Sequence, residues 1–212
     1  MSVILIVDDH HLIRTGVKNL LEGSFADMRV EGAETVATAL SFLQRHTDVD
    51  LVLMDIKLPD ASAMDGLTRL KQVHPATPVA MISGIEDNDV ISAALSSGAD
   101  GFVPTSADPQ ILVNAVSLIL QGEIFLPRSF LKADRSDALQ PSLPIQEIKL
   151  TDRQSGVLTL MCAGLSNKEI ARKLDLSEST IKTHVSAILK ELGTTSRTKA
   201  IAQANALGWP AV

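Results

Sequence analysis

The sequence predicts two domains of different class: an α/β domain built on a doubly wound parallel sheet, followed by an all-α domain of four helices. Short apolar runs alternate with helical patterns through residues 1–125, which is typical of βαβ units. Prolines, serines and mixed charges replace this alternation in residues 126–148, which is the composition of a linker. Residues 149–212 carry only helical patterns, so we expect no strand there.

The expected strands and helices of the first domain alternate five times. The strands occupy residues 3–7, 29–32, 51–54, 79–82 and 101–103. The helices occupy residues 12–21, 35–45, 66–73, 88–97 and 109–121. The last helix has both of its ends marked, because Asp108 is suited to an N-cap, Pro109 to the first helical position and Gly122 to the residue after the end.

The second domain shows four short helical patterns, over residues 152–162, 167–174, 178–192 and 197–207. Each follows a residue that favours an N-cap: Thr151, Ser166, Ser177 and Ser196. The second and third helices are separated by the tight turn at residues 175–176. This spacing predicts a helix-turn-helix.

The composition restricts the class of protein. A chain of 212 residues is long enough for two domains, and its hydrophobic content of 45% with 21% charged residues is typical of globular proteins. No apolar run approaches the roughly 18 to 20 residues that cross a bilayer, and the N-terminus lacks the features of a signal peptide. The single cysteine, Cys162, excludes an internal disulfide. We expect a soluble, cytoplasmic protein without a membrane partner.

The net charge of −6 is unevenly distributed. Residues 1–125 carry 7 Lys and Arg against 17 Asp and Glu, whereas residues 149–212 carry 9 against 5. Because an acidic domain is repelled by a polyanion, only the second domain is suited to approach double-stranded DNA.

Polar residues follow three of the expected strands. Asp8 and Asp9 follow the first, Asp55 the third and Ser83 the fourth. In a doubly wound sheet these positions meet at one edge, where ligands bind. Three carboxylates at one edge favour Mg²⁺, and an aspartate beside Mg²⁺ can attack a phosphoryl group. The alternative is that the first two aspartates cap a helix and that Asp55 is a solvated strand end.

Three segments together resemble the receiver domain of bacterial two-component response regulators, in the subfamily that carries a LuxR-type DNA-binding domain (the NarL/FixJ subfamily). They are Val7-Asp8-Asp9-His10 with Arg14 and Gly16, Leu53-Met54-Asp55, and the stretch from Gly98 to Pro104. The resemblance covers nearly the whole chain apart from the linker, and it implies a flavodoxin-like (βα)5 fold.

The resemblance also implies roles for individual residues. Asp55 would accept a phosphoryl group from a sensor histidine kinase. Mg²⁺ would be bound by Asp9, Asp55 and the backbone carbonyl of Lys57, with Asp8 assisting through water. Ser83 and Phe102 would form the switch pair, although a turn position for Ser83 and a core position for Phe102 are the plainer alternatives.

The chain departs from the family pattern at one charged position. Thr105 stands where receivers of this family usually carry a lysine that pairs with the acceptor carboxylate, and we count it with the switch residues. No Lys or Arg occurs in residues 72–127, so a substitute cation must come from Lys57, from elsewhere in the first 71 residues or from a partner. By the same resemblance, the loop at residues 59–66 is about three residues longer than the corresponding loop of the family.

Two rival chemistries fit poorly. Haloacid-dehalogenase-type phosphatases need a second acid two residues after the nucleophilic aspartate, and position 57 is a lysine. A nucleotide-binding domain needs a glycine-rich loop after the first strand, where this chain reads Asp-Asp-His-His. We therefore expect a regulator rather than an enzyme, and the phosphatase remains the weakest alternative.

The helix at residues 178–192 has two faces. Apolar residues recur with helical spacing along one face, and the other carries short polar and basic side chains suited to a DNA groove. A solvated face of an ordinary bundle is the plain alternative. The stretch from Ser166 to Ala171 with Ser177 to His184, Arg197 and Thr198 closely resembles the LuxR-type domain. That resemblance implies base contacts by Lys182, Thr183 and Ser186, and backbone contacts by Asn167, Lys168, Thr180, Lys190 and Arg197.

These expectations combine into a DNA-binding transcriptional response regulator that a histidine kinase phosphorylates on Asp55, with control of dimerisation and DNA binding. The family resemblance implies a homodimer through the last helix or the receiver, with RNA polymerase as a further partner. A phosphorylation-independent regulator, motivated by Thr105, is the main alternative.

Overall fold

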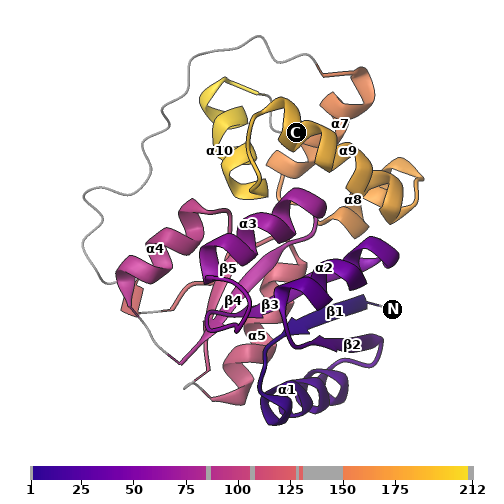
Figure 1. Cartoon of the computed structure of the whole chain (residues 1–212). Coiled ribbons are helices and arrows are strands. Elements are labelled where there is room, and N and C mark those ends of the chain that lie inside the picture. Colours follow the sequence, from indigo (N-terminus) through magenta and orange to yellow (C-terminus); the bar gives the residue numbers. More distant parts are fainter. Residues whose placement is uncertain (1, 85–86, 106–107, 128, 131–149, 210–212) are drawn as a thin grey trace.

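The structure is a computed structural model, and it describes residues 2–84, 87–105, 108–127, 129–130 and 150–209. An α/β unit and a unit of four helices lie against each other (Figure 1). The predicted linker at residues 126–148 lies mostly outside the described residues, as do the last three residues of the chain. Within the described residues, no helix has both the length and the apolar character needed to cross a membrane.

The α/β unit contains a five-stranded sheet. Its strands are β1 (Ser2–Val7), β2 (Met28–Ala33), β3 (Val49–Asp55), β4 (Val79–Ser83) and β5 (Gly101–Pro104). They pair in the order β2-β1-β3-β4-β5, and all pairs are parallel. This order confirms the predicted doubly wound sheet and places β1 and β3 side by side at its centre.

Helices cover both faces of the sheet. They are α1 (His11–Ser24), α2 (Val36–Arg45), α3 (Ala63–Val73), α4 (Asn88–Ser96) and α5 (Pro109–Leu120). Alternate residues of β1 point to opposite faces, as the pleat of a strand requires. Leu5 packs in the core under α2, α3 and α4, whereas Ile4 and Ile6 pack in the core under α1 and α5.

The helical unit consists of α7 (Asp152–Cys162), α8 (Asn167–Leu174), α9 (Glu178–Glu191) and α10 (Arg197–Ala206). All four predicted N-caps accept hydrogen bonds from backbone amides of the first turn, and Ser166 with Glu169 forms the predicted capping box. The apolar stripe of α9 is buried in the core of this unit, at Ile181, Val185, Ile188 and Leu189.

Two predicted helix boundaries are wrong by three residues. The first helix, expected to end at Leu21, continues to Ser24. The helix expected to begin at Gly66 begins at Ala63, because the Ser62 side chain accepts a hydrogen bond from Asp65 N and caps it. The residues that make this loop appear long are therefore partly the first turn of α3. Another loop residue, Asp60, accepts hydrogen bonds of 3.0 Å from the amides of Val36 and Ala37 at the start of α2.

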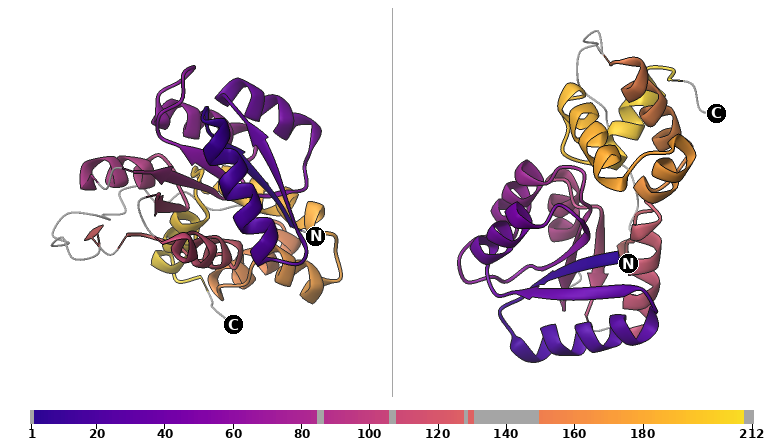
Figure 2. Two further views of the ribbon diagram at one scale, coloured as in Figure 1. Left: turned by 90° about the horizontal axis from the view of Figure 1, so that it is seen from below. Right: turned by 90° about the vertical axis from the view of Figure 1, so that its right-hand side faces the viewer.

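The two units touch where the amino ends of the strands meet α9 and α10, and Figure 2 shows the helical unit beside that end of the sheet. Lys182 Nζ donates to Val49 O at 2.9 Å, and Lys199 Nζ donates to Ser96 O at 2.6 Å. Ala76, from the α3–β4 connection, packs against the core of the helical unit. The helical unit therefore lies opposite the edge where the predicted acidic pocket is located.

Candidate functional site: an acidic pocket and a docked recognition helix

The carboxyl ends of the central strands bring the predicted acids together. Val7 pairs with Met54 in the β1–β3 register, and each is followed in the chain by an aspartate, Asp8 and Asp55. Carboxylate oxygens of Asp8, Asp9 and Asp55 and a ring nitrogen of His10 all lie within 4.8 Å of one another. The predicted convergence of the three carboxylates is confirmed.

The pocket strongly favours a cation. Burial and then the charge of Asp8 raise the pKa of Asp55, whereas hydrogen bonds from the backbone amides of Ile56 and Lys57 lower it and compensate only in part. The Ile56 amide donates to Asp55 Oδ1 at 2.8 Å. A half-buried carboxylate beside further carboxylates is stabilised by a positive charge placed between them. The donor set of carboxylate oxygens and its spacing fit a divalent ion such as Mg²⁺.

His10 belongs to the acidic cluster, although sequence reasoning assigned it no role in the pocket. Its Nδ1 lies 3.1 Å from Asp8 Oδ1 and 2.8 Å from Asp9 Oδ1. The hydrogen bond to Asp8 and the charges of Asp9 and Asp8 raise the pKa of His10. Among the described residues, it is the only side chain that forms an ion pair with the carboxylates of this cluster. The signal in the sequence is its place directly after Asp9.

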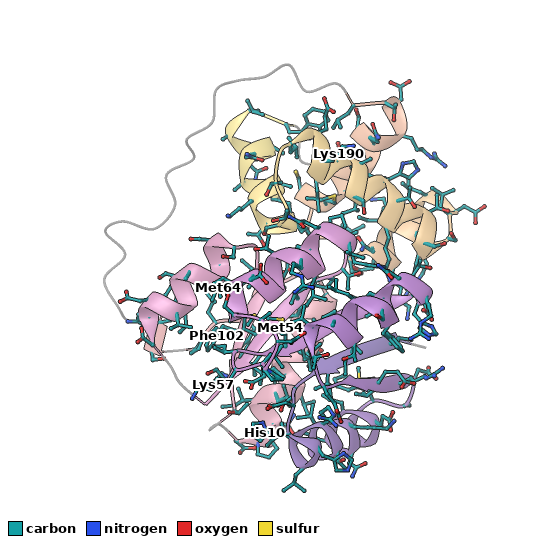
Figure 3. All side chains as sticks on the ribbon, viewed as in Figure 1. His10, Met54, Lys57, Met64, Phe102 and Lys190 are labelled. Carbon is teal, nitrogen blue, oxygen red and sulfur yellow. The ribbon has the colours of Figure 1, made fainter. Side chains whose placement is uncertain are left out.

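Two other cations lie near the edge. Arg14, on α1, donates to the backbone carbonyl of Asp8 at 2.6 Å and pairs with Glu34. The Lys57 side chain is exposed, and its backbone belongs to the loop after Asp55. Figure 3 shows His10 and Lys57 at the same end of the α/β unit, far from Lys190 on the helical unit.

The predicted switch residues occupy different environments. Ser83 is buried at the end of β4, and Phe102 is fully buried in the core within β5. Thr105 is exposed just after β5, and its amide donates to Ser83 O at 2.8 Å. The structure therefore places a neutral hydroxyl group at the edge where receivers usually place a lysine.

The predicted DNA-contact residues divide into exposed and protein-bound groups. The exposed residues are Lys168, Thr183 and Lys190, whereas Asn167, Thr180, Lys182, Ser186 and Arg197 are half-buried. The Thr180 hydroxyl lies 2.7 Å from the capping hydroxyl of Ser177. Ser186 Oγ donates to the backbone carbonyl of Lys182.

Two basic side chains of this set are bound within the protein. Lys182 Nζ lies 3.0 Å from Asp50 Oδ1, at the start of β3. Arg197 donates to Asn167 Oδ1 at 3.2 Å and to Leu165 O at 2.5 Å. Burial lowers the pKa of Arg197 to about 10. The α9 face suited to DNA is therefore partly covered by the α/β unit.

Comparisons with known proteins assign both units. Residues 4–117 match the response regulator receiver domain, and residues 149–204 match the luxR family of bacterial regulatory proteins. The chain is 34% identical to the glycerol metabolism activator of Pseudomonas putida, over 100% of this chain and 98% of that one. It is 31% identical to the nitrate/nitrite response regulator NarL of Escherichia coli K12, over 94% and 93% of the two chains.

A solved structure supports the same assignment. A LuxR family DNA-binding response regulator from Silicibacter pomeroyi is 59% identical over 61% of this chain and 99% of that one, with a TM-score of 0.55. Proteins of this family are transcription factors rather than enzymes, so the phosphatase alternative is rejected. The acidic edge, the helix-turn-helix and these matches agree: the chain belongs to the NarL-type family of DNA-binding transcriptional response regulators, with a receiver domain followed by a LuxR-type helix-turn-helix domain.

Proposed function

We propose that a sensor histidine kinase phosphorylates Asp55, and that phosphorylation releases the helix-turn-helix domain for dimerisation and DNA binding. The observation that carries this proposal is the position of β3, which has an acidic cluster at one end and the docked recognition helix at the other. Asp55 ends this strand, and Asp50 near its start holds Lys182. The five residue steps of extended strand from Asp50 to Asp55 span about 17 Å.

The acidic edge is suited to phosphoryl transfer. An oxygen of Asp55 attacks phosphorus in line with the leaving group, which requires the carboxylate to be unprotonated. Asp8, Asp9, Asp55 and the Lys57 carbonyl would hold Mg²⁺, which when bound neutralises the charge that develops on the phosphoryl oxygens. The Ser83 hydroxyl would donate to a phosphoryl oxygen, and Phe102 would repack around the shifted serine.

The docked arrangement suits an off state. Lys182 cannot reach a base edge while its ammonium donates to Val49 O and Asp50. The interface is also incompletely packed, because a cavity of about 340 Å³ lies between the domains, lined by Pro75, Arg172 and Lys182 among others. An interface with a cavity and few polar contacts opens at a lower cost than a packed core. A small shift in the receiver would then change the population of the open state.

The remaining features of the proposal follow the family. The receiver would span residues 1–125, the linker 126–148 and the DNA-binding domain 149–212. Lys182, Thr183 and Ser186 would contact bases, with Asn167, Lys168, Thr180, Lys190 and Arg197 on the DNA backbone. Pairing of two chains through α10 would place two recognition helices about 34 to 36 Å apart. The protein would act in the cytoplasm, with RNA polymerase as a downstream partner.

A second candidate function is supported by Thr105. Without the usual lysine, phosphorylation would be weakly coupled to the rest of the receiver, and the domain would serve as a docking or dimerisation module. The DNA-binding activity is common to both candidates, so only the role of Asp55 separates them.

Intact mass after incubation with acetyl phosphate and Mg²⁺ tests the first candidate, with Asp55→Asn as the control. We expect one phosphoryl group on the wild type, none on the variant, and tighter DNA binding by the modified wild type. Addition of the group without any change in DNA affinity would favour the second candidate. If Thr105→Lys then restored the response, the missing lysine would be identified as the cause.

A further inference from the structure

His10 brings a nitrogen donor into a cluster that is otherwise made of carboxylates. A ring nitrogen of His10 is one of four ligand atoms that lie within 4.8 Å of one another, and the other three belong to Asp8, Asp9 and Asp55. The backbone fixes this position, because the His10 amide donates to Asp8 Oδ1 at 2.7 Å. The ring thus points toward the acids rather than away from them.

We propose that His10 Nδ1 is a direct ligand of the metal in this pocket, so that the site prefers a borderline transition ion such as Co²⁺, Ni²⁺ or Zn²⁺ to Mg²⁺. This inference rests on the metal site of the proposed function, and it concerns which ion that site selects. His10 Nδ1 would thus be a metal ligand in addition to the carboxylates and the Lys57 carbonyl.

The donor chemistry supports this preference. Mg²⁺ is a hard ion that takes oxygen ligands at about 2.0 to 2.1 Å and keeps several waters. Imidazole suits Zn²⁺, Ni²⁺ and other transition ions, and it binds Zn²⁺ at about 2.0 to 2.1 Å. One imidazole nitrogen with two or three carboxylate oxygens is a mixed donor set of the kind that such ions occupy.

The spacing of the cluster is close to that of a coordination shell. Two ligands on opposite sides of an ion lie about 4.2 Å apart when each bond is about 2.1 Å long. The separations of at most 4.8 Å in this cluster exceed that span by no more than about 0.6 Å. Rotation of aspartate and histidine side chains about their χ angles supplies shifts of this size without backbone movement.

The surroundings of His10 allow its ring to exchange its contacts with carboxylates for a bond to a metal ion. The His10 side chain is 66% exposed, so metal binding would replace two contacts to carboxylates and disturb no buried packing. The other ring nitrogen would remain available to water. His10 is also the N-cap residue of α1 and makes no side-chain capping bond, so the ring has no competing structural role there.

The adjacent residue provides a matched control. His11 is the first residue of α1 and is exposed, and its ring is not part of the cluster. His10→Ala and His11→Ala therefore remove the same group from neighbouring positions, and only the first removes a proposed ligand. Any metal bound adventitiously by surface histidines would be affected by either substitution.

The test measures binding of Mg²⁺ and of Co²⁺ or Ni²⁺ by titration calorimetry on the full chain of the wild type and both variants. We expect His10→Ala to weaken Co²⁺ and Ni²⁺ binding by at least about 10- to 100-fold, since loss of even an outer-shell partner of a ligand costs that much. Mg²⁺ binding should change by less than about threefold, since Mg²⁺ is held by the oxygen ligands. His11→Ala should resemble the wild type with every ion.

A spectroscopic measurement adds a readout that does not depend on affinity. Pulsed electron paramagnetic resonance of the Mn²⁺-loaded protein should show coupling to a ¹⁴N nucleus in the wild type and in His11→Ala, and none in His10→Ala. Equal Co²⁺ affinity of all three proteins, or absence of the ¹⁴N coupling from the wild type, would overturn the role of His10 and leave an oxygen-only site. Failure of the wild type to bind any of these ions would overturn the metal site of the proposed function as well.

Discussion

Lys182 of the recognition helix and Asp50 of the receiver form an ion pair, with 3.0 Å between Nζ and Oδ1. Their side chains are only 12% and 17% exposed. The other carboxylate oxygen of Asp50 accepts a hydrogen bond from Val3 N, so this aspartate joins β1, β3 and α9. A side chain expected to read DNA is thus held by the end of the sheet that lies opposite the acidic pocket.

Asp50→Asn should increase the DNA affinity of the unphosphorylated protein. Asparagine keeps an oxygen for Val3 N but loses the charge that holds Lys182. The loss of a partly buried ion pair of about 1 kcal/mol corresponds to about fivefold tighter DNA binding, measured by fluorescence anisotropy. Asp48→Asn, an exposed position in the same segment, is the matched control and should leave the affinity unchanged. Equal affinities of Asp50→Asn and wild type would show that this pair does not restrain α9.

Lys182→Ala should cost about 1 to 3 kcal/mol of specific binding and relax base preference, because it removes a contact expected at a base edge. The same substitution frees α9 from the receiver, so the comparison is best made in the Asp50→Asn background. Lys190→Ala should weaken binding to all DNA sequences alike. It should also make the slope of log K against log salt concentration shallower by about one. If Lys182→Ala also acted equally on all sequences, Lys182 would be a phosphate contact.

Gly98→Ala should destabilise the receiver and loosen its contact with the helical domain. Gly98 has φ of +102°, and an added Cβ would lie 2.9 Å from Thr195 Oγ1. The left-handed backbone costs about 1 to 2 kcal/mol with a Cβ, and the close contact adds to that cost in the docked state. Gly122→Ala introduces a similar strain at φ of +89° with no atom nearer than 3.7 Å.

Thermal melts and DNA affinity together separate these two effects. Both glycine variants should melt at a lower temperature than the wild type, whereas only Gly98→Ala should bind DNA more tightly. Tighter binding by both variants would mean that receiver instability, rather than the contact with Thr195, opens the interface.

Lys71→Met should lower the free energy of unfolding by about 3 to 5 kcal/mol. The Lys71 ammonium is buried against Asp100, and it also donates to Thr77 O at 3.2 Å. Methionine fills a similar volume but leaves the Asp100 carboxylate buried without a cation. Urea denaturation measures the loss, and Arg69→Met provides the comparison. Arg69 pairs with Asp65 at the surface, so its loss should cost less than about 1 kcal/mol. Equal costs at the two positions would contradict the assignment of Asp100 as a buried charge.

His74 should make interdomain docking dependent on pH. Burial lowers the pKa of His74, a hydrogen bond with the Leu43 backbone opposes this effect, and the charge of Lys182 lowers the pKa further. Because the pKa of His74 in the docked protein lies below its ordinary value of 6.5, the contribution of neutral His74 to docking is complete above that value. It is lost as the pH falls through the lowered pKa.

Titration of the His74 ring by nuclear magnetic resonance tests the contribution of Lys182. The pKa of His74 should rise in Lys182→Gln, because a nearby positive charge is removed. Lys190→Gln, which removes a charge from an exposed position on α9, should have no such effect. An unchanged pKa in both variants would indicate that α9 does not lie against His74 in solution.

The sequence by itself determined the two-domain plan, the order of strands and helices, the caps of the helical domain and the convergence of Asp8, Asp9 and Asp55. These features depend on local rules. The spacing of apolar residues sets the type of element, Ser and Thr caps set helix starts, and the parallel sheet places the ends of β1 and β3 at one edge. The start of α3 was mistaken because Ser62 caps it from within a segment that reads as a loop.

Tertiary structure alone decided the contacts of His10, Asp50 and Lys71. The His10 ring lies against the carboxylates of Asp8 and Asp9, and the partner of Lys182 lies 132 residues away in the chain. Contacts between residues so distant in sequence leave no periodic pattern, since each depends on how completed elements pack against one another. The sequence could therefore indicate the acidic pocket and the DNA-reading helix, whereas only the folded chain reveals that a single strand, β3, contacts both.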